Sequence, residues 1–247
     1  MADDASGGSG EGSGEGSGGG PGRAVKQLPA WRWRAEVARS EPIERFAPEE
    51  TAIGISYDSE PYAVLMATPR NVIDLAVGFT VTERVASLAD ILDVRVSEQA
   101  DGLVADILLS KTGAANVREQ RRRTLEGRSS CGLCGLQNPA DVMRALPVAP
   151  DGLVVAPQAI QRALKVLDVE QSLGQQTRAT HAAAWVSMEG ELLLTREDVG
   201  RHNALDKLIG ASARTGLDPS SAFVLVTSRC SFEMVEKAAL EIGRAHV

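Results

Sequence analysis

The sequence has little cysteine, few aromatic residues and no long apolar run. Its 247 residues include three cysteines, and aromatic side chains make up 4% of the chain. Three cysteines are too few for a disulfide framework, which excludes the small secreted scaffolds that depend on one. No apolar run approaches the ~20 residues of a transmembrane helix. The acidic, Gly/Ser-rich beginning also lacks the basic start and apolar stretch of a secretory signal. The sequence therefore predicts a cytoplasmic protein with no membrane partner.

Basic charge is also scarce. The chain carries 33 acidic and 26 basic residues, which gives a net charge of -7. A chain-wide nucleic-acid binder needs a positive field to hold phosphates, so the sequence predicts no nucleic-acid partner. Apolar residues make up 43% of the chain, enough for a sizeable buried core. Residues 1–22 repeat Gly-Ser and Gly-Glu and have almost nothing to bury. We expect residues 1–24 to form a disordered tail.

Alternating apolar residues predict strands in the first half of the chain. Residues 53–57 and 62–66 form a predicted hairpin with a loop of about four residues, and two further strands are expected at 92–96 and 103–109. Thr68-Pro69 predicts a helix start, with Thr68 as the cap, before an apolar helical stretch over 72–85.

The second half alternates helices and strands. A helix is predicted over 157–167, with Ile160, Leu164 and Leu167 on its apolar face, and another over 202–211. A hairpin is predicted over 182–186 and 191–195, a strand over 222–227, and a last helix capped by Ser231. This mixture predicts an α/β (α+β mixed) fold with a smaller β-rich N-terminal lobe and a larger second lobe. The predicted organisation is a tail (1–24), an N-terminal lobe (25–117), a basic loop (118–138) and the larger lobe (139–247).

The basic loop contains the strongest chemical signal, a Cys-x-x-Cys pair. Cys131 and Cys134 lie among glycines and serines, downstream of Arg128 and an arginine run at 121–123. A thiolate is the nucleophilic form of cysteine, and nearby positive charge lowers the pKa of a thiol. Four interpretations stay open at this point: a sulfur relay, a structural zinc site, a dithiol oxidoreductase and an unreactive pair. The zinc site would need further ligands from Cys230, His181, His202 and His246. Cys230 follows a predicted buried strand, so we expect it to pack rather than react.

Zinc-dependent deaminase chemistry is disfavoured by the order of the motifs. Such enzymes use His-x-Glu followed by Pro-Cys-x-x-Cys. Here His181 is followed by two alanines, and the cysteine pair precedes the histidine.

A second signal is the polar run from Arg196 to Lys207, between a predicted strand and an amphipathic helix. Free backbone N–H groups and the helix dipole favour an anion at a helix N-terminus. Arg201, His202 and Asn203 add side-chain donors at that end. The alternative is an ordinary charged helix start capped by Asp198, with Arg201 in solvent.

At these residues the chain resembles the FdhD family of sulfurtransferases required for formate dehydrogenase activity. The resemblance rests on the motifs at 127–135 and 196–210, with further similarity at 61–69, 76–80 and 228–235. It spans roughly residues 49–239.

The resemblance implies a specific function. A cysteine desulfurase would supply sulfur as a persulfide on Cys131, with Cys134 assisting or resolving. The sulfur would pass to the molybdenum (or tungsten) bis-guanine-dinucleotide cofactor destined for formate dehydrogenase. That cofactor is a bound substrate, and no tightly bound metal belongs to the protein itself. The resemblance further implies a homodimer, a larger lobe similar to cytidine deaminase, and a cofactor pocket lined by His181, Asp198, Arg201, His202 and Asn203.

The sequence departs from the family at three places. Arg84 and Arg178 stand where glycine is usual, and either would be strained if its position needs a positive φ angle. The family also continues beyond the last helix. The resemblance therefore implies that this chain is a fragment, a frameshifted copy or a truncated product whose last elements are missing.

Overall fold

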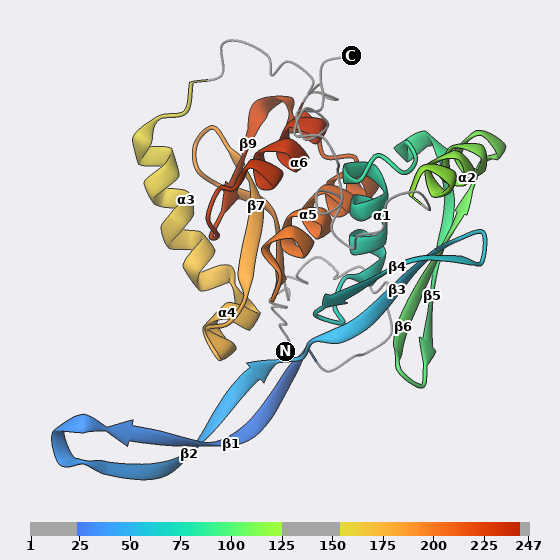
Figure 1. The fold of residues 1–247 in the computed structure, drawn as a ribbon. Coiled ribbons are helices and arrows are strands. Elements are labelled where there is room, and N and C mark those ends of the chain that lie inside the picture. Colours follow the sequence, from blue (N-terminus) through green and yellow to red (C-terminus); the bar gives the residue numbers. More distant parts are fainter. Residues whose placement is uncertain (1–23, 125–153, 243–247) are drawn as a thin grey trace, which may run out of the picture.

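The computed structural model describes residues 24–124 and 154–242, which form two lobes and a projecting two-stranded arm (Figure 1). The arm consists of β1 (Val25–Arg34) and β2 (Arg39–Pro48). The N-terminal lobe contains β3 (Thr51–Tyr57), β4 (Glu60–Ala67), α1 (Val72–Thr82), β5 (Ile91–Gln99), β6 (Gly102–Leu109) and α2 (Lys111–Thr124). The second lobe contains α3 (Pro157–Glu170), α4 (Ser172–Thr177), β7 (His181–Ser187), β8 (Leu192–Asp198), α5 (Arg201–Thr215), β9 (Ala222–Val226) and α6 (Phe232–Ile242).

The N-terminal lobe is a four-stranded mixed sheet with its core on one face. Its strand order is β4-β3-β6-β5, with β3 and β6 parallel and the other pairs antiparallel. Because side chains alternate along a strand, the odd-numbered residues of β3 and β6 point to the same face. Ile53, Ile55 and Ile107 on that face are at most 1% exposed and pack against α1.

The second lobe is a three-stranded antiparallel sheet covered on both faces. The strand order is β8-β7-β9. Ala183 and Trp185 of β7 belong to the core formed with α5, whereas Ala182, Ala184 and Val186 belong to the core formed with α3. A strand that is buried on both faces has no polar side, which explains the apolar run in β7.

Helices α1 and α5 cross at van der Waals contact and join the two lobes (Figure 1). A Cβ atom added to Gly78 of α1 would lie 1.7 Å from the backbone oxygen of Asp206 in α5. A Cβ atom added to Gly210 of α5 would lie 1.9 Å from the backbone oxygen of Asp74 in α1. The two glycines therefore allow the backbones to approach more closely than any other residue would permit.

The predicted mixed α+β class and all the predicted strands and helices are confirmed. Three local predictions are wrong. Ser231 directly precedes α6, but its hydroxyl has no hydrogen-bond partner, so it does not cap the helix as predicted. The loop between β3 and β4 has two residues, Asp58 and Ser59, both with positive φ (51° and 67°), as a type I′ hairpin turn requires. Thr68 does not cap α1, because the helix starts four residues later, after Asn71. The hydroxyl of Thr68 is used elsewhere, in the buried cluster described below.

The two arginines that replace the family's glycines both adopt the left-handed conformation. Arg84 has φ of 58° and Arg178 has φ of 53°. Both arginines therefore have the positive φ angle that strains a residue other than glycine. A left-handed backbone costs a residue with a Cβ atom about 1–2 kcal/mol relative to glycine.

Two further expectations differ from the structure. Helix α2 continues to Thr124, so the first seven residues of the predicted basic loop are helical, and the predicted boundary at 138 lies outside the described residues. In α3 the buried residues are Ala159, Ala163 and Leu167. Ile160 and Leu164, expected on the inner face, are 38% and 47% exposed because small alanines make the closest contact with the sheet. Among the described helices, none is long and apolar enough to cross a membrane.

We predict that Gly78→Ala lowers the free energy of unfolding by more than 2 kcal/mol, because the new methyl group must force two helix backbones apart. Gly54→Ala is the control, since its Cβ atom would meet Val104 at an ordinary 3.4 Å. Chemical denaturation of both variants measures the difference. Equal losses would show that the helix crossing tolerates a wider spacing.

Candidate functional site

The site is built on a buried ion pair between Asp198, at the end of β8, and Lys207 in α5. Lys207 Nζ lies 2.6 Å from Asp198 Oδ2, and both side chains are 0% exposed. The ammonium group also donates to the backbone oxygen and the hydroxyl oxygen of Thr68, at 2.9 and 2.8 Å. Thr68 in turn donates its N–H and its hydroxyl to Asp198 Oδ2. All three ammonium hydrogens therefore have an acceptor.

Burial lowers the pKa of Lys207, because desolvation outweighs the attraction of Asp198. A buried ion pair contributes little net stability, but the loss of one partner leaves an uncompensated charge in the core. The pair therefore acts as a lock. It fixes the end of β8, the side of α5 and the loop after β4 relative to one another.

Asp198 also shapes the first turn of α5. Its second oxygen, Oδ1, accepts hydrogen bonds from the Gly200 N–H at 2.8 Å and from Asn203 Nδ2 at 3.1 Å. Asn203 Nδ2 donates its other hydrogen to the backbone oxygen of Met66 at 2.8 Å. A Cβ atom on Gly200 would lie 2.8 Å from Asn203 Nδ2, so glycine leaves room for this amide. The amide nitrogen of Asn203 is thus fully used inside the protein, and its oxygen is the atom left for a ligand.

The first turn of α5 carries polar groups with no internal hydrogen bond. The helix begins after Gly200, which has no side chain to cap it. Arg201 Nε and His202 Nε2 are buried atoms without a hydrogen-bond partner. His202 Nε2 lies 2.8 Å from a carboxylate oxygen of Glu233 in α6, an ion-pair contact without hydrogen-bond alignment. A helix start without a side-chain cap, beside an arginine whose Nε atom has no hydrogen-bond partner, is suited to an anion.

The structure brings together the five residues that the resemblance placed in the cofactor pocket. His181 is the first residue of β7 and lies opposite Asp198 in the sheet register, and Arg201, His202 and Asn203 form the start of α5. The five residues differ in burial, however. Asp198 is 0% exposed and lies beneath the site, where it positions its neighbours. His181, Arg201, His202 and Asn203 are partly exposed.

A second buried ionic cluster fixes α6 to the far side of the α1–α5 crossing. Lys237 Nζ lies 2.9 Å from Asp206 Oδ1 and 2.8 Å from Glu83 Oε1, and Thr82 donates to Asp206. Desolvation acts to lower the pKa of Lys237, but the carboxylates of Asp206 and Glu83 more than offset it, so the pKa is raised. Because α6 carries Glu233, this cluster also places the carboxylate that faces His202.

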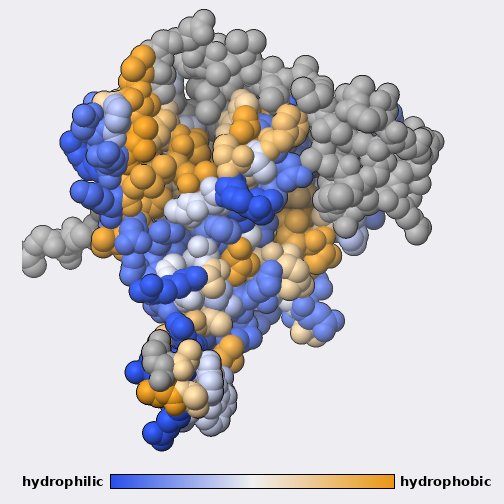
Figure 2. Space-filling view, turned by 60° about the vertical axis from the view of Figure 1, so that its left-hand side comes forward, coloured by the Kyte–Doolittle hydropathy of each residue, from blue (hydrophilic) through white to orange (hydrophobic). Residues whose placement is uncertain are grey.

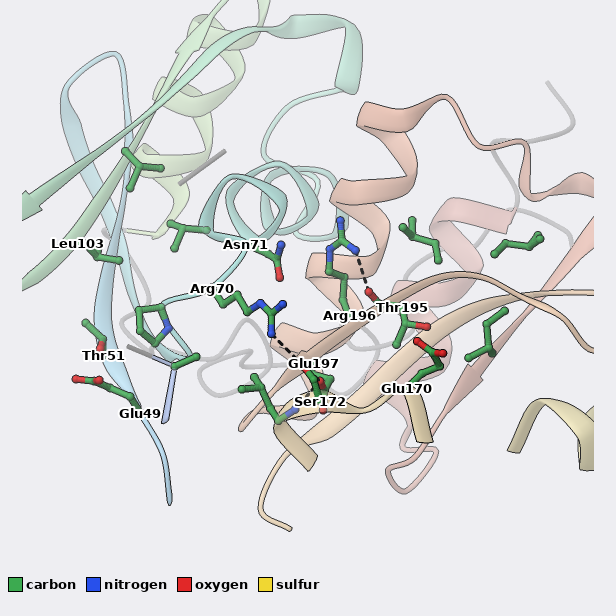
Figure 3. Close-up of a pocket in the computed structure, with 18 of the residues that line it drawn as sticks. Glu49, Thr51, Arg70, Asn71, Leu103, Glu170, Ser172, Thr195, Arg196 and Glu197 are labelled. Carbon is green, nitrogen blue, oxygen red and sulfur yellow. Dashed lines mark hydrogen bonds between the residues drawn. The ribbon is translucent and has the colours of Figure 1, made fainter. Parts of the chain in front are cut away.

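A cleft of about 1340 Å³ lies beside the site, between the N-terminal sheet and the β8–α3–α4 face (Figure 3). Glu197 points into the first turn of α4, where it accepts the N–H groups of Leu173 and Gly174 at 3.0 and 2.8 Å. Arg70 donates to Ser172, and Arg196 pairs with Asp74 at 2.8 Å. Acidic residues outnumber basic residues in the lining, so the cleft is less suited to a polyanion than the start of α5.

The cysteines divide between described and undescribed segments. Cys131 and Cys134 lie outside the described residues, so the structure does not bear on their predicted roles. Cys230 was expected to pack in the core after a buried strand, but it is exposed, because it lies in the connection between β9 and α6. Within residues 24–124 and 154–242, no three His, Cys, Asp or Glu side chains gather as metal ligands would.

Sequence reasoning missed Thr68 and Lys207, although one signal for Lys207 was available. Lys207 falls on the same helical face as Ala204, Leu208 and Ala211, all buried. A lysine on an apolar face requires a buried acceptor, and only tertiary structure identifies it as Asp198.

Fold and site together define a two-lobed α+β protein in which a buried ion pair between Asp198 and Lys207 holds the start of α5 in place. Residues 48–243 match the model of the FdhD/NarQ family, and the chain belongs to that family. It is 43% identical over 192 residues to the sulfur carrier protein FdhD of Bordetella petrii, covering 77% of this chain and 69% of that protein. It is 41% identical over 220 residues to the sulfur carrier protein FdhD of Xanthomonas euvesicatoria, covering 89% and 76%.

A solved structure has the same fold. The crystal structure described as a formate dehydrogenase accessory protein from Desulfotalea psychrophila superposes with a TM-score of 0.64. The superposition covers 89% of this chain and 80% of that chain, at 19% sequence identity.

We predict that Lys207→Met lowers the free energy of unfolding by about 3–5 kcal/mol, because Asp198 becomes a buried charge without a partner. Lys165→Met is the matched control. Lys165 is exposed in α3, so its change should stay within about 0.5 kcal/mol. Urea unfolding measures both variants. The double variant Asp198→Asn/Lys207→Met should recover part of the loss, and a double variant less stable than Lys207→Met alone would contradict the lock.

Proposed function

We propose that this protein is a sulfurtransferase that carries sulfur for formate dehydrogenase. Membership of the FdhD/NarQ family carries the proposal, together with relatives more than 40% identical that are named sulfur carrier proteins. The described residues support it through the start of α5, where Arg201 and His202 offer donors to an anionic substrate. In this proposal the protein works in the cytoplasm as a homodimer, with a cysteine desulfurase as the sulfur donor.

The sulfur steps balance with the two thiols of the Cys-x-x-Cys motif. The Cys131 thiolate attacks the terminal sulfur of the desulfurase persulfide. A sulfur–sulfur bond forms on Cys131, and the bond in the desulfurase breaks, with its cysteine leaving as a thiolate. Cys134 then attacks the Sγ atom of Cys131. This forms a Cys131–Cys134 disulfide and releases the carried sulfur as sulfide, so two thiols are oxidised while one sulfur is reduced.

The substrate that receives the sulfur is, by family resemblance, the molybdenum or tungsten bis-guanine-dinucleotide cofactor. Its phosphates suit the start of α5, because backbone N–H groups lie there together with the Arg201 guanidinium and the His202 ring. The oxygen of Asn203 is an acceptor, so it suits an N–H or O–H group of the nucleotide rather than a phosphate. Asp198 and Lys207 hold this surface in place from below.

We predict that incubation with a cysteine desulfurase and cysteine adds one sulfur atom to the protein, and that mild reduction removes it. Cys131→Ala should abolish the gain, because the accepting thiolate is lost. Cys134→Ala should load normally, because Cys134 acts only when the carried sulfur is passed on. Cys230→Ala is the control and should load fully, even though Cys230 is exposed. Intact-mass analysis reads all four proteins, and full loading of Cys131→Ala would overturn the assignment.

We predict that the protein binds GDP, used as a probe for the guanine-nucleotide arms. Arg201→Ala should weaken binding by about tenfold to a hundredfold, because a charge-assisted hydrogen bond contributes about 1.5–3 kcal/mol. Arg95→Ala is the control, since Arg95 lies on β5 with a side chain 79% exposed. Calorimetric titration measures the dissociation constants. Equal affinities of the two variants for GDP would show that the nucleotide does not bind at the start of α5.

A further inference from the structure

Strand β8 has a free edge. The sheet order β8-β7-β9 places β8 at one end, and no described strand pairs with its other side. Such an edge presents backbone N–H and C=O groups that can pair with another chain. The direction of these groups follows from β7. The N–H of Ala182 donates to the Thr227 hydroxyl at 2.9 Å, and its C=O accepts the Thr227 N–H at 3.0 Å, so both groups point toward β9.

The register then identifies the groups of β8 that face outward. Backbone groups alternate in direction along a strand, so those of Ala183 point toward β8, where Ala183 lies opposite Arg196. The backbone groups of Arg196 therefore point toward β7, and those of Thr195 and Glu197 point away from it, off the edge of the sheet. The Thr195 carbonyl agrees with this direction, because it accepts a hydrogen bond from a side chain, Arg196 Nη1, at 2.8 Å.

The cleft beside the functional site follows this edge. Its lining includes every residue from 190 to 197, that is, the turn before β8 and most of the strand. Successive side chains of a strand point to opposite faces, so a cleft lined by all of them runs along the edge rather than over one face. The other walls are the ends of β3, β5 and β6 and the helices α3 and α4 (Figure 3). The volume of about 1340 Å³ exceeds the roughly 300–1,000 Å³ of small-molecule pockets, which leaves room for a chain segment.

The β8 edge is not guarded against pairing. Edge strands are usually protected by lysine, proline or other charged side chains. Strand β8 contains neither lysine nor proline, and its charged side chains are engaged inside the protein. Arg196 pairs with Asp74 at 2.8 Å, and Glu197 accepts two N–H groups from the first turn of α4. Asp198 is buried beneath the functional site. The outward-facing backbone groups therefore remain accessible from the cleft.

The charge of the cleft favours a basic occupant. Its lining contains five glutamates and three arginines. The side chains of Glu98, Glu170 and Glu191 are exposed, and in the part of the chain that the structure describes they have no hydrogen-bond or ion-pair partner. Complementary charge across an interface sets the choice of partner and speeds association. A segment with several positive side chains therefore suits these walls.

The arginines of the cleft, in contrast, have acceptors in the protein itself. Arg70 donates to the Ser172 hydroxyl at 3.1 Å, and Arg162 donates to the backbone oxygen of Glu189 at 2.7 Å. The third arginine is Arg196, paired with a carboxylate as described above. The charges left without a partner are thus negative.

The cleft also offers apolar contacts between its charges. Leu193 on β8 is 44% exposed, and Val166 on α3 is 39% exposed. Both line the cleft. Because side chains alternate along an extended segment, an occupant with basic and apolar residues in turn can meet both kinds of contact.

The arm of the same chain leaves the cleft open, because it projects away from both lobes (Figures 1 and 2). We propose that the cleft binds an extended basic segment of a partner protein, whose backbone adds to the β8 edge as a further strand. Main-chain hydrogen bonds hold the segment, and the glutamates of the walls select its charge. The inference rests on the edge and the charges of the cleft and stands apart from the sulfur chemistry.

Calorimetric titration of the full chain with a synthetic peptide tests the proposal. The probe is an eight-residue peptide of alternating lysine and valine, matched in length to 190–197. It should bind at one site per chain, and added salt should weaken it because the glutamates are exposed. The same peptide with glutamate in place of lysine should bind about tenfold more weakly or less. No binding of the lysine peptide at about 1 mM, or equal binding of both peptides, would overturn the proposal.

Removal of one outward N–H group tests the backbone pairing. Thr195→Pro removes a donor that points off the edge and spares the ladder to β7, which is where strands tolerate proline. It should weaken binding of the lysine peptide about tenfold relative to Thr195→Ala, which keeps the N–H. A lysine–valine peptide methylated on every backbone nitrogen makes the same test on the unchanged protein, whether or not the proline variant folds. Undiminished binding of the methylated peptide would rule out strand addition.

A triple variant tests the charge of the cleft. Glu98→Gln/Glu170→Gln/Glu191→Gln should weaken binding of the lysine peptide about tenfold at low salt, because three ion pairs are lost. It should also reduce the effect of added salt on the affinity.

A matched triple variant separates the cleft from the overall charge of the protein. Glu44→Gln/Asp93→Asn/Asp168→Asn removes three exposed carboxylates outside the cleft and should change the affinity by no more than about twofold. Equal losses in the two triple variants would place the peptide outside the cleft and overturn the proposal. Sulfur loading is measured separately, so failure of peptide binding and failure of the sulfur function give different results.

Discussion

The closeness of α1 and α5 is the constraint on which the rest of the structure depends. Gly78 and Gly210 bring the two backbones into direct contact, and this contact joins an N-terminal β-rich lobe to the second lobe. Because the helices cannot shift without a clash, polar groups on either side of the crossing can be held in fixed positions. Two buried ionic clusters use that rigidity, one centred on Lys207 and the other on Lys237.

The two clusters serve the start of α5 from opposite sides. The Asp198–Lys207–Thr68 cluster ties the first turn of α5 to the end of β8 and to the loop after β4. The Asp206–Lys237 cluster ties α6 to the same helix and places Glu233 beside His202. Buried charges stabilise a fold little, but they specify one arrangement strongly. Here the specified arrangement is a helix start at which the Nε atom of Arg201 has no hydrogen-bond partner and His202 faces Glu233.

The Asn203 side chain illustrates how such a surface acquires selectivity. Its amide nitrogen faces two acceptors, the Met66 carbonyl and the Asp198 carboxylate, which leaves the amide oxygen for a ligand. The polar residues of one short motif thus divide into donors that suit phosphate and an acceptor that suits an N–H or O–H group. A motif of the same composition with a different internal hydrogen-bond pattern would bind different chemistry.

Local pattern was sufficient to predict the type and place of most elements from the sequence. Alternation marked β3 and β4, helical spacing marked α5, and the motif at 196–210 pointed to the correct helix start. The resemblance also singled out Arg84 and Arg178 as residues that would be strained at a positive φ, and the structure shows that both have one. These predictions succeeded because the signals lie within a few consecutive residues. The same reasoning failed for Thr68, assigned as a cap, and for Cys230, expected in the core.

Only the tertiary structure decided which residues far apart in the sequence are in contact. Thr68 and Asp198 are 130 residues apart, and no local pattern indicates that they share a hydrogen bond. The role of Lys207 depends on that contact, as does the internal position of Asp198 beneath the site rather than in its lining. The free edge of β8 likewise becomes visible only when the sheet order and the strand register are known. The sequence determined the elements and the chemistry of the motif, because both are local. Packing determined which polar groups are used internally and which remain for a ligand, because burial is a property of the whole fold.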